Sequence, residues 1–112
     1  MSLFSGGLKV GTVPGTGSAI DVPLGFTPAV IMLWNETDPG LFIWSAKMAD
    51  AEALKLTDAV ALTFPTSNGI SVYAGSDTPG SEESKGFTIG ADSDLNAASD
   101  VIHYAAFAGE AV

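Results

Sequence analysis

The sequence predicts an all-β protein, an antiparallel β-sandwich of jelly-roll-like type with at most one short helical turn. The chain has 112 residues, a usual size for one domain, so residues 1–112 are expected to share a single core. Its apolar stretches are short and are separated by 13 glycines and six prolines. Hydrophobic residues make up 46% of the chain and charged residues 15%, a balance that is typical of folded proteins.

Eight segments are expected to be strands, because each is rich in apolar or β-branched residues and is bounded by turn residues. They are Leu8–Val13, Ser18–Val22, Ala29–Trp34, Leu41–Met48, Leu54–Leu56, Gly69–Ala74, Gly86–Gly90 and Val101–Ala108. The stretch "SAKMADAEALKLTDAVAL" is ambiguous, since it contains several helix-forming residues. We interpret it as a hairpin rather than a helix.

Charge and composition argue against several classes of partner. Acidic residues number 13 against four lysines and no arginine, so the formal charge of −9 would repel nucleic acid. The absence of cysteine excludes disulfides, thiolate metal sites and cysteine nucleophiles. The longest apolar run, "AVIMLW", is far shorter than the ~20 residues that span a bilayer, and the N-terminus lacks a signal-peptide pattern. We therefore expect a soluble, unsecreted protein that binds neither nucleic acid nor membrane.

Two predicted strands are apolar on both faces. In "AVIMLW" the even-numbered and the odd-numbered residues are both hydrophobic, and "LFIW" repeats this pattern. A strand with one face in water should alternate with polar residues, so either another subunit or the long mid-chain segment must cover the second face. We favour a subunit, and thus a closed homo-oligomer, because monomers rarely expose large apolar patches. The residues expected at the oligomer interface are Ile31, Leu33, Trp34, Phe42, Trp44, Tyr104 and Phe107.

Candidate chemistry lies near the C-terminus. Asp92, Asp94 and Asn96 match the first three ligand positions of a calcium loop, but Ala97 replaces its glycine and His103 its bidentate glutamate. A polar turn is the preferred interpretation, with calcium as the alternative. The only histidine, His103, lies in an apolar strand without a nucleophile motif, so we expect it to have a packing role. We assign no catalytic, cofactor-binding or metal-binding residue and do not expect an enzyme.

Aromatic and acidic residues leave two further functions open. Trp34, Trp44 and Tyr73 offer flat apolar faces on which sugar rings could stack, although core or interface packing is the more usual role of residues in apolar runs. A glycoside hydrolase needs only a pair of carboxylates, but the sequence does not show which of them converge.

Two segments carry a family resemblance. "DVPLGFTPAVIMLW" resembles an entry strand, and "GFTIG" followed by "LNAASDVIHYAAFA" resembles a closing hairpin, of small β-sandwich virion proteins of tailed bacteriophages. The resemblance covers Asp21–Trp34 and Gly86–Ala108, about a third of the chain. The turn "NAASD" departs from the pattern because it lacks a glycine before the last strand. The plan is also similar to H-type lectin sandwiches, although no sugar-binding residue can be matched.

The resemblance implies a function and a location. The family's members occur in tail-fibre tips and capsid-decorating proteins, commonly as trimers. We therefore expect a non-enzymatic virion structural protein, made in the host bacterial cytoplasm, that forms a homo-oligomer, namely a trimer, and contacts other virion proteins. The alternative is an oligomeric, lectin-like module that binds a cell-surface glycan.

Overall fold

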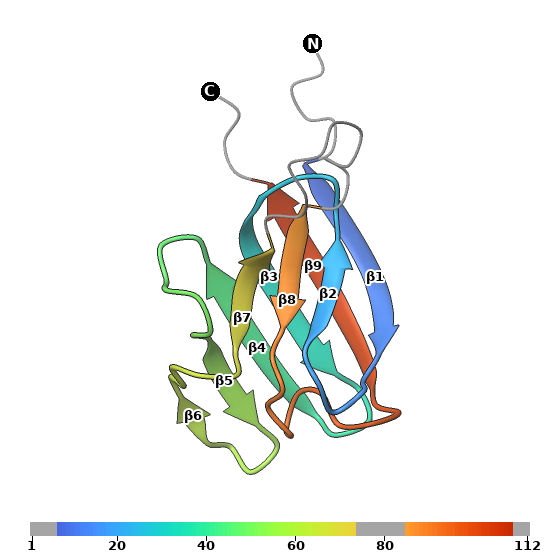
Figure 1. Cartoon of the computed structure of the whole chain (residues 1–112). Helices are drawn as coiled ribbons and strands as arrows, with labels where there is room; N and C mark the ends of the chain where they lie inside the picture. The colour runs from blue at the N-terminus through green and yellow to red at the C-terminus, as the bar shows by residue number, and fades with distance from the viewer. Residues whose placement is uncertain (1–6, 74–84, 109–112) are drawn as a thin grey trace.

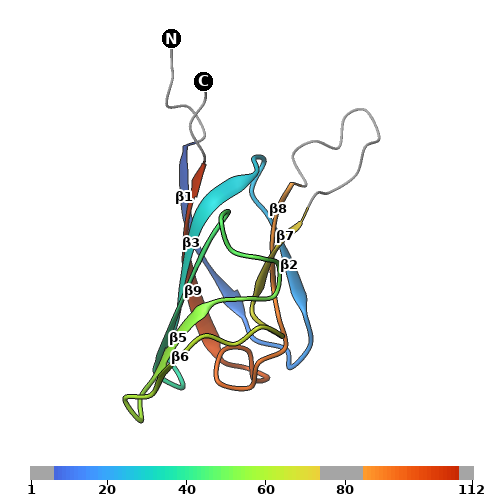
Figure 2. The same cartoon turned by 90° about the vertical axis from the view of Figure 1, so that its left-hand side faces the viewer.

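The computed structural model describes residues 7–73 and 85–108, which form nine strands in two antiparallel sheets and contain no helix (Figures 1 and 2). The six-stranded sheet contains, in order across it, β1 (Leu8–Pro14), β9 (Val101–Ala108), β3 (Pro28–Asn35), β4 (Gly40–Ser45), β5 (Leu54–Thr57) and β6 (Leu62–Thr63). The three-stranded sheet contains β2 (Ile20–Pro23), β8 (Gly86–Ile89) and β7 (Ile70–Tyr73). The predicted all-β sandwich is confirmed. Within these residues no helix is long and apolar enough to cross a membrane.

The two ends of the described chain pair with each other in a nested order. β1 pairs with β9 in the larger sheet, and β2 pairs with β8 in the smaller one. This alternation between sheets gives the sandwich its jelly-roll-like character. β3, β4, β5 and β6 instead follow one another as a meander in the larger sheet. The larger sheet is therefore wider than the smaller sheet that covers it.

The predicted strands lie close to the observed ones, with two differences. The strand expected to run from Leu41 to Met48 ends at Ser45, where the Met48 N–H donates to the Ser45 carbonyl and turns the chain. β6 was not predicted, because two residues are too few to show a pattern. The ambiguous mid-chain segment forms the β5–β6 hairpin rather than a helix. Ala74 lies outside the described residues.

The core fills the space between the sheets with aliphatic and aromatic side chains. From the larger sheet it takes Ile31, Leu33, Phe42, Trp44, Ile102, Tyr104 and Ala106, and from the smaller sheet Val22, Ile70, Phe87 and Ile89. Phe87 and Tyr104 join the two sheets through an edge-to-face contact with ring centroids 5.5 Å apart. A Cβ added at Gly11 would lie 2.6 Å from the Tyr104 hydroxyl oxygen, so only glycine fits beside this ring.

Two buried asparagines fasten the loops at the end of the sandwich opposite the described termini. The Asn35 amide donates to the Leu95 carbonyl and to Asp100 Oδ2, both at 2.8 Å, and its oxygen accepts from two N–H groups of the β3–β4 turn. The Asn96 side chain likewise accepts from a backbone N–H and donates to a backbone carbonyl of the β1–β2 loop. Because each side chain has all of its hydrogen-bonding groups paired, both are buried without a desolvation penalty.

Candidate functional site

The outer face of the six-stranded sheet is apolar across its whole width. We call "outer face" the side chains that point away from the smaller sheet, in three rows set by the strand register. The first row is Leu8, Phe107, Val30 and Ser45, the second is Val10, Ala105, Met32, Ile43 and Leu54, and the third is Thr12, His103, Trp34, Leu41, Leu56 and Leu62. None of these residues is an Asp, Glu or Lys. The one titratable side chain among them is His103.

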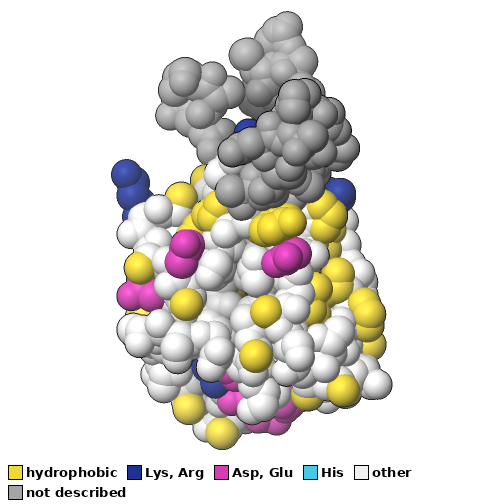
Figure 3. Space-filling view, viewed as in Figure 1, with side chains coloured by type: hydrophobic (Ala, Val, Ile, Leu, Met, Phe, Trp, Pro, Cys, Tyr) yellow, Lys and Arg dark blue, Asp and Glu magenta, His cyan; other side chains and the backbone are white. Residues whose placement is uncertain are grey.

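Several outer-face side chains are open to solvent. The exposed fractions are 65% for Val10, 58% for Leu8, 59% for Leu62, and 39% for both Trp34 and Phe107. Figure 2 shows the sandwich from the side, with no described segment over this face. Figure 3 shows the opposite side, over β2, β7 and β8, where hydrophobic side chains are scattered and gather toward the upper edge and toward the margin near β1. Of the eight large hydrophobic residues that are exposed in the described part of the chain, five lie in these three rows.

The structure divides the seven predicted interface residues into two groups. Ile31, Leu33, Phe42, Trp44 and Tyr104 are buried between the sheets of their own chain. They are not available to another subunit, which corrects their expected placement. Trp34 and Phe107 lie on the outer face. An Ile31→Asp substitution would put a carboxylate in the core, so it would report on folding and not on assembly.

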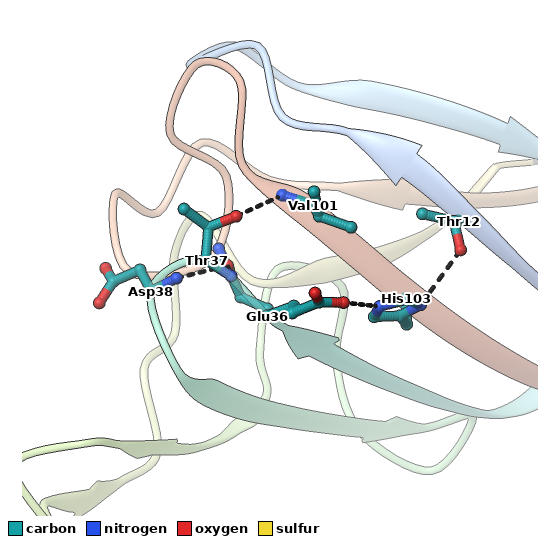
Figure 4. Close-up of polar contacts among 7 residues, drawn as sticks. Thr12, Glu36, Thr37, Asp38, Val101 and His103 are labelled. Carbon is teal, nitrogen blue, oxygen red and sulfur yellow. Dashed lines mark hydrogen bonds and ion pairs between the residues drawn. The ribbon is translucent and has the colours of Figure 1, made fainter.

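His103 is the centre of a polar set on the outer face (Figure 4). Its Nε2 lies 2.6 Å from Glu36 Oε1 and its Nδ1 lies 3.1 Å from Thr12 Oγ1. Because a carboxylate only accepts, Nε2 donates to Glu36, and in the neutral ring Nδ1 then accepts the Thr12 hydroxyl proton. The imidazole also stacks on Trp34, with ring centroids 5.8 Å apart and planes inclined by 21°.

The order hydroxyl, imidazole, carboxylate is the order used by nucleophilic hydrolases. Here the set lies on an open sheet surface, and the Glu36 side chain is 66% exposed, so water is not excluded from it. The arrangement can orient the imidazole and satisfy both of its nitrogens. The three side chains therefore form a small polar site within an apolar surface.

Sequence reasoning missed Thr12 and Glu36 as partners of His103. Thr12 lies opposite His103 on β1, and Glu36 directly follows β3, which pairs with β9 on its other side. The pairing of β1 and β3 with β9 brings these distant residues together. The alternation of side chains along each strand could have placed these residues on the same face of the sheet. That inference requires the strand order, which the sequence does not show.

Asp92 and Asp94 bind a lysine rather than converging with Asn96. Lys55 Nζ lies 2.8 Å from Asp92 Oδ2 and 2.8 Å from Asp94 Oδ2, and its amine stands 5.7 Å from the centre of the Phe42 ring. Burial lowers the pKa of Lys55, but the hydrogen bonds and charges of the two carboxylates outweigh it, so the pKa is raised above its ordinary value. An ammonium group thus occupies the position that the calcium interpretation gives to a metal.

Asn96 has a structural role. Its side-chain oxygen accepts from the Thr16 N–H at 2.8 Å, and its amide donates to the carbonyls of Ser18 at 2.7 Å and Gly90 at 3.0 Å. The side chain is fully buried. It therefore holds the β1–β2 loop against the β8–β9 loop.

Lys9, Lys47 and Lys85 lie toward the end of the sandwich where β1 begins. Carboxylates gather at the other end, although Figure 3 shows acidic side chains in the upper half of the molecule as well. That acidic end contains Glu36, Asp38, Asp58, Asp92, Asp94 and Asp100. Partial desolvation and the carboxylates of Asp58, Asp94 and Asp100 raise the pKa of Asp38.

No protein-family model, curated protein or solved structure matches this chain.

Proposed function

We propose that the protein is a non-enzymatic structural component of a bacteriophage or prophage virion, decorating a capsid or forming part of a tail or fibre, and that it acts through homo-oligomeric assembly. The observation that carries the assembly is the apolar outer face. Burying such a face against another surface stabilises the associated state by about 25 cal/mol for each Å² of apolar surface removed from water. A monomer that leaves such a face open is prone to associate.

The virion part of the proposal is supported by the resemblance of Asp21–Trp34 and Gly86–Ala108 to phage sandwich proteins. Those segments contain β8 and β9 and all but one residue each of β2 and β3. They supply parts of both sheets and much of the core. The acidic surface and the absence of arginine are compatible with a protein on the outside of a particle, away from nucleic acid.

Two measurements test the proposal. Light scattering coupled to size exclusion should give a mass that is a multiple of the 11.4 kDa chain. Antibodies raised against the purified protein should label intact phage particles released by the source strain. A monomer at all concentrations would refute the assembly, and unlabelled particles would refute the virion role.

Glycan binding is the second candidate, and the polar set around His103 favours it. Trp34 is a partly exposed indole beside an imidazole, a carboxylate and a hydroxyl, groups that can stack on and hydrogen-bond to a sugar. A glycan array would show binding that Trp34→Ala abolishes and that Phe107→Ala retains. Phe107→Ala is the matched control, since it removes an equally exposed aromatic residue from another row of the same face.

A further inference from the structure

We propose that the partner of the outer face is the outer face of a second copy of the chain. The two-fold axis lies between the two sheets and runs across their strands, so that the strands of the copies are antiparallel. This inference rests on the self-assembly proposed above. It adds the partner, the surface and the direction of packing.

The outer face has the size of a protein interface. Six strands about 4.8 Å apart span about 24 Å, and three rows with their side chains extend about 20 Å along the strands. Two copies in contact would therefore cover about 1,000 Å² in projection, which reaches the lower limit for a specific protein interface. A sugar ring or a short side chain would cover only a small part of it.

A second sheet fits the shape of this surface. Apolar sheet faces pack about 10 Å apart with their side chains interdigitating, as the two sheets of this sandwich already do. Along β9 the small Ala105 lies between the larger Phe107 and His103, so the outer face is lower at the middle of this strand. An axis through the middle row places Phe107 of one copy against the row that contains Trp34 of the second copy.

The charges at the two ends select the antiparallel arrangement. Lys47 lies beyond the first row, where β4 has ended, and Glu36, Asp38 and Asp58 flank the third row. An axis across the strands puts Lys47 of each copy on the side of the carboxylates of the other. An axis along the strands would instead bring the two acidic ends together, which like-charge repulsion opposes.

The polar set around His103 does not prevent burial. Both imidazole nitrogens already have a hydrogen-bond partner within the chain, in Glu36 and Thr12. A polar group that is paired before association can be covered at much lower cost than an unpaired one. The set also makes the third row chemically different from the first row. The contact of a first row with a third row therefore differs from the contact of two like rows.

The test uses single cysteines, because the chain has none of its own. Leu8→Cys marks the first row of β1 and Thr12→Cys marks the third row of the same strand. Facing sheets lie about 10 Å apart, farther than the Cα separation of about 7 Å that a disulfide can bridge, so a short bismaleimide is the cross-linker. Mass spectrometry distinguishes cross-links between unlike chains from those between like chains.

We expect a dimer in solution, and we expect a mixture of Leu8→Cys and Thr12→Cys to give several-fold more cross-linked dimer than either variant alone. Val10→Glu should raise the dimer dissociation constant at least tenfold. Ser71→Glu should leave it unchanged, since Ser71 lies on β7 opposite Thr88 and points outward from the smaller sheet, away from the outer face. Circular dichroism checks that both variants fold.

Four results would overturn parts of this inference. A dimer in which the mixture cross-links no better than either variant alone would refute the antiparallel axis and leave assembly through the outer face intact, because an axis along the strands places β1 over β6 of the second copy. A trimer, which the family resemblance implies, would refute the two-fold pair and still agree with homo-oligomeric assembly. An oligomer that Val10→Glu and Phe107→Glu both leave intact would show that another surface associates. A monomer at every concentration would refute the inference and the proposed self-assembly together.

Discussion

Trp34 and His103 stack face to face on the outer face of the six-stranded sheet, with ring centroids 5.8 Å apart. They lie opposite each other on β3 and β9, and Thr12 lies opposite His103 on β1. One row therefore collects an indole, an imidazole and a hydroxyl from three strands, and Glu36 adds a carboxylate from the end of β3. This combination is the most distinctive local feature of a surface that is otherwise mostly apolar.

Assembly through the outer face should shield Trp34 from solvent. We expect acrylamide to quench the tryptophan fluorescence of the assembled protein several-fold less than that of Val10→Glu, because Trp44 is buried in both and Trp34 is exposed only in the monomer. Trp34→Phe is the control, since it retains only Trp44. Equal quenching of the wild type and Val10→Glu would show that Trp34 is not at the interface.

Lys55→Met should destabilise the fold. The substitution removes the ammonium group that contacts both Asp92 and Asp94, and the Asp92 side chain is only 11% exposed. We expect a loss of about 1–3 kcal/mol in the free energy of unfolding, measured by urea titration. Lys47→Met at an exposed position is the control. The same small loss in both variants would mean that the ion pairs contribute no net stability.

The stability of the protein should fall at alkaline pH. Burial raises the pKa of Tyr104 above its ordinary value of 10.0, and that of Lys55 is raised above 10.5 by its two carboxylates despite partial burial. Since both folded-state pKa values exceed the unfolded ones, the stabilisation is complete below the unfolded pKa and is lost as pH rises through the folded pKa. Urea midpoints from about pH 9 to about pH 11 should fall more in the wild type than in Lys55→Met. Parallel curves would contradict the role of Lys55.

Asn96→Asp should be strongly destabilising. The new carboxylate would face the carbonyl oxygens of Ser18 and Gly90, to which the amide now donates. We expect a cost of about 2–4 kcal/mol, because buried acceptors lose their donor and meet a negative charge. Asn68→Asp, the same change at an exposed position, is the control. If calcium instead restored the stability of Asn96→Asp, the calcium interpretation of this loop would be correct.

Val60→Gly should stabilise the monomer fold. Val60 has φ of 61° in the β5–β6 turn, a left-handed conformation that is unfavourable for a β-branched residue, and it is 84% exposed. Relief of this strain should raise the free energy of unfolding by about 1 kcal/mol. Val60→Ala, which keeps a Cβ, should give a smaller gain. A lower melting temperature for Val60→Gly would indicate that the valine makes a favourable contact.

Local signals were enough to predict most of the strands. β9 spans Val101–Ala108 as predicted, and β3 extends the predicted Ala29–Trp34 by one residue at each end. Both are long, strongly apolar and bounded by turn residues, so pattern and propensity agree. β6 has only two residues, and its existence depends on pairing with β5 and not on its own sequence.

The sequence by itself determined the fold class, the strand positions and the presence of two strands that are apolar on both faces. It did not determine which of those faces is the core. Ile31 and Leu33 are as hydrophobic as Val30 and Met32, so alternation alone does not distinguish the two sides. The tertiary structure decided this when the smaller sheet covered one face and left the other open, and it placed Thr12, Glu36 and His103 together for the same reason. Such contacts depend on strand order and sheet packing, which join residues far apart in the chain and leave no mark on any single segment.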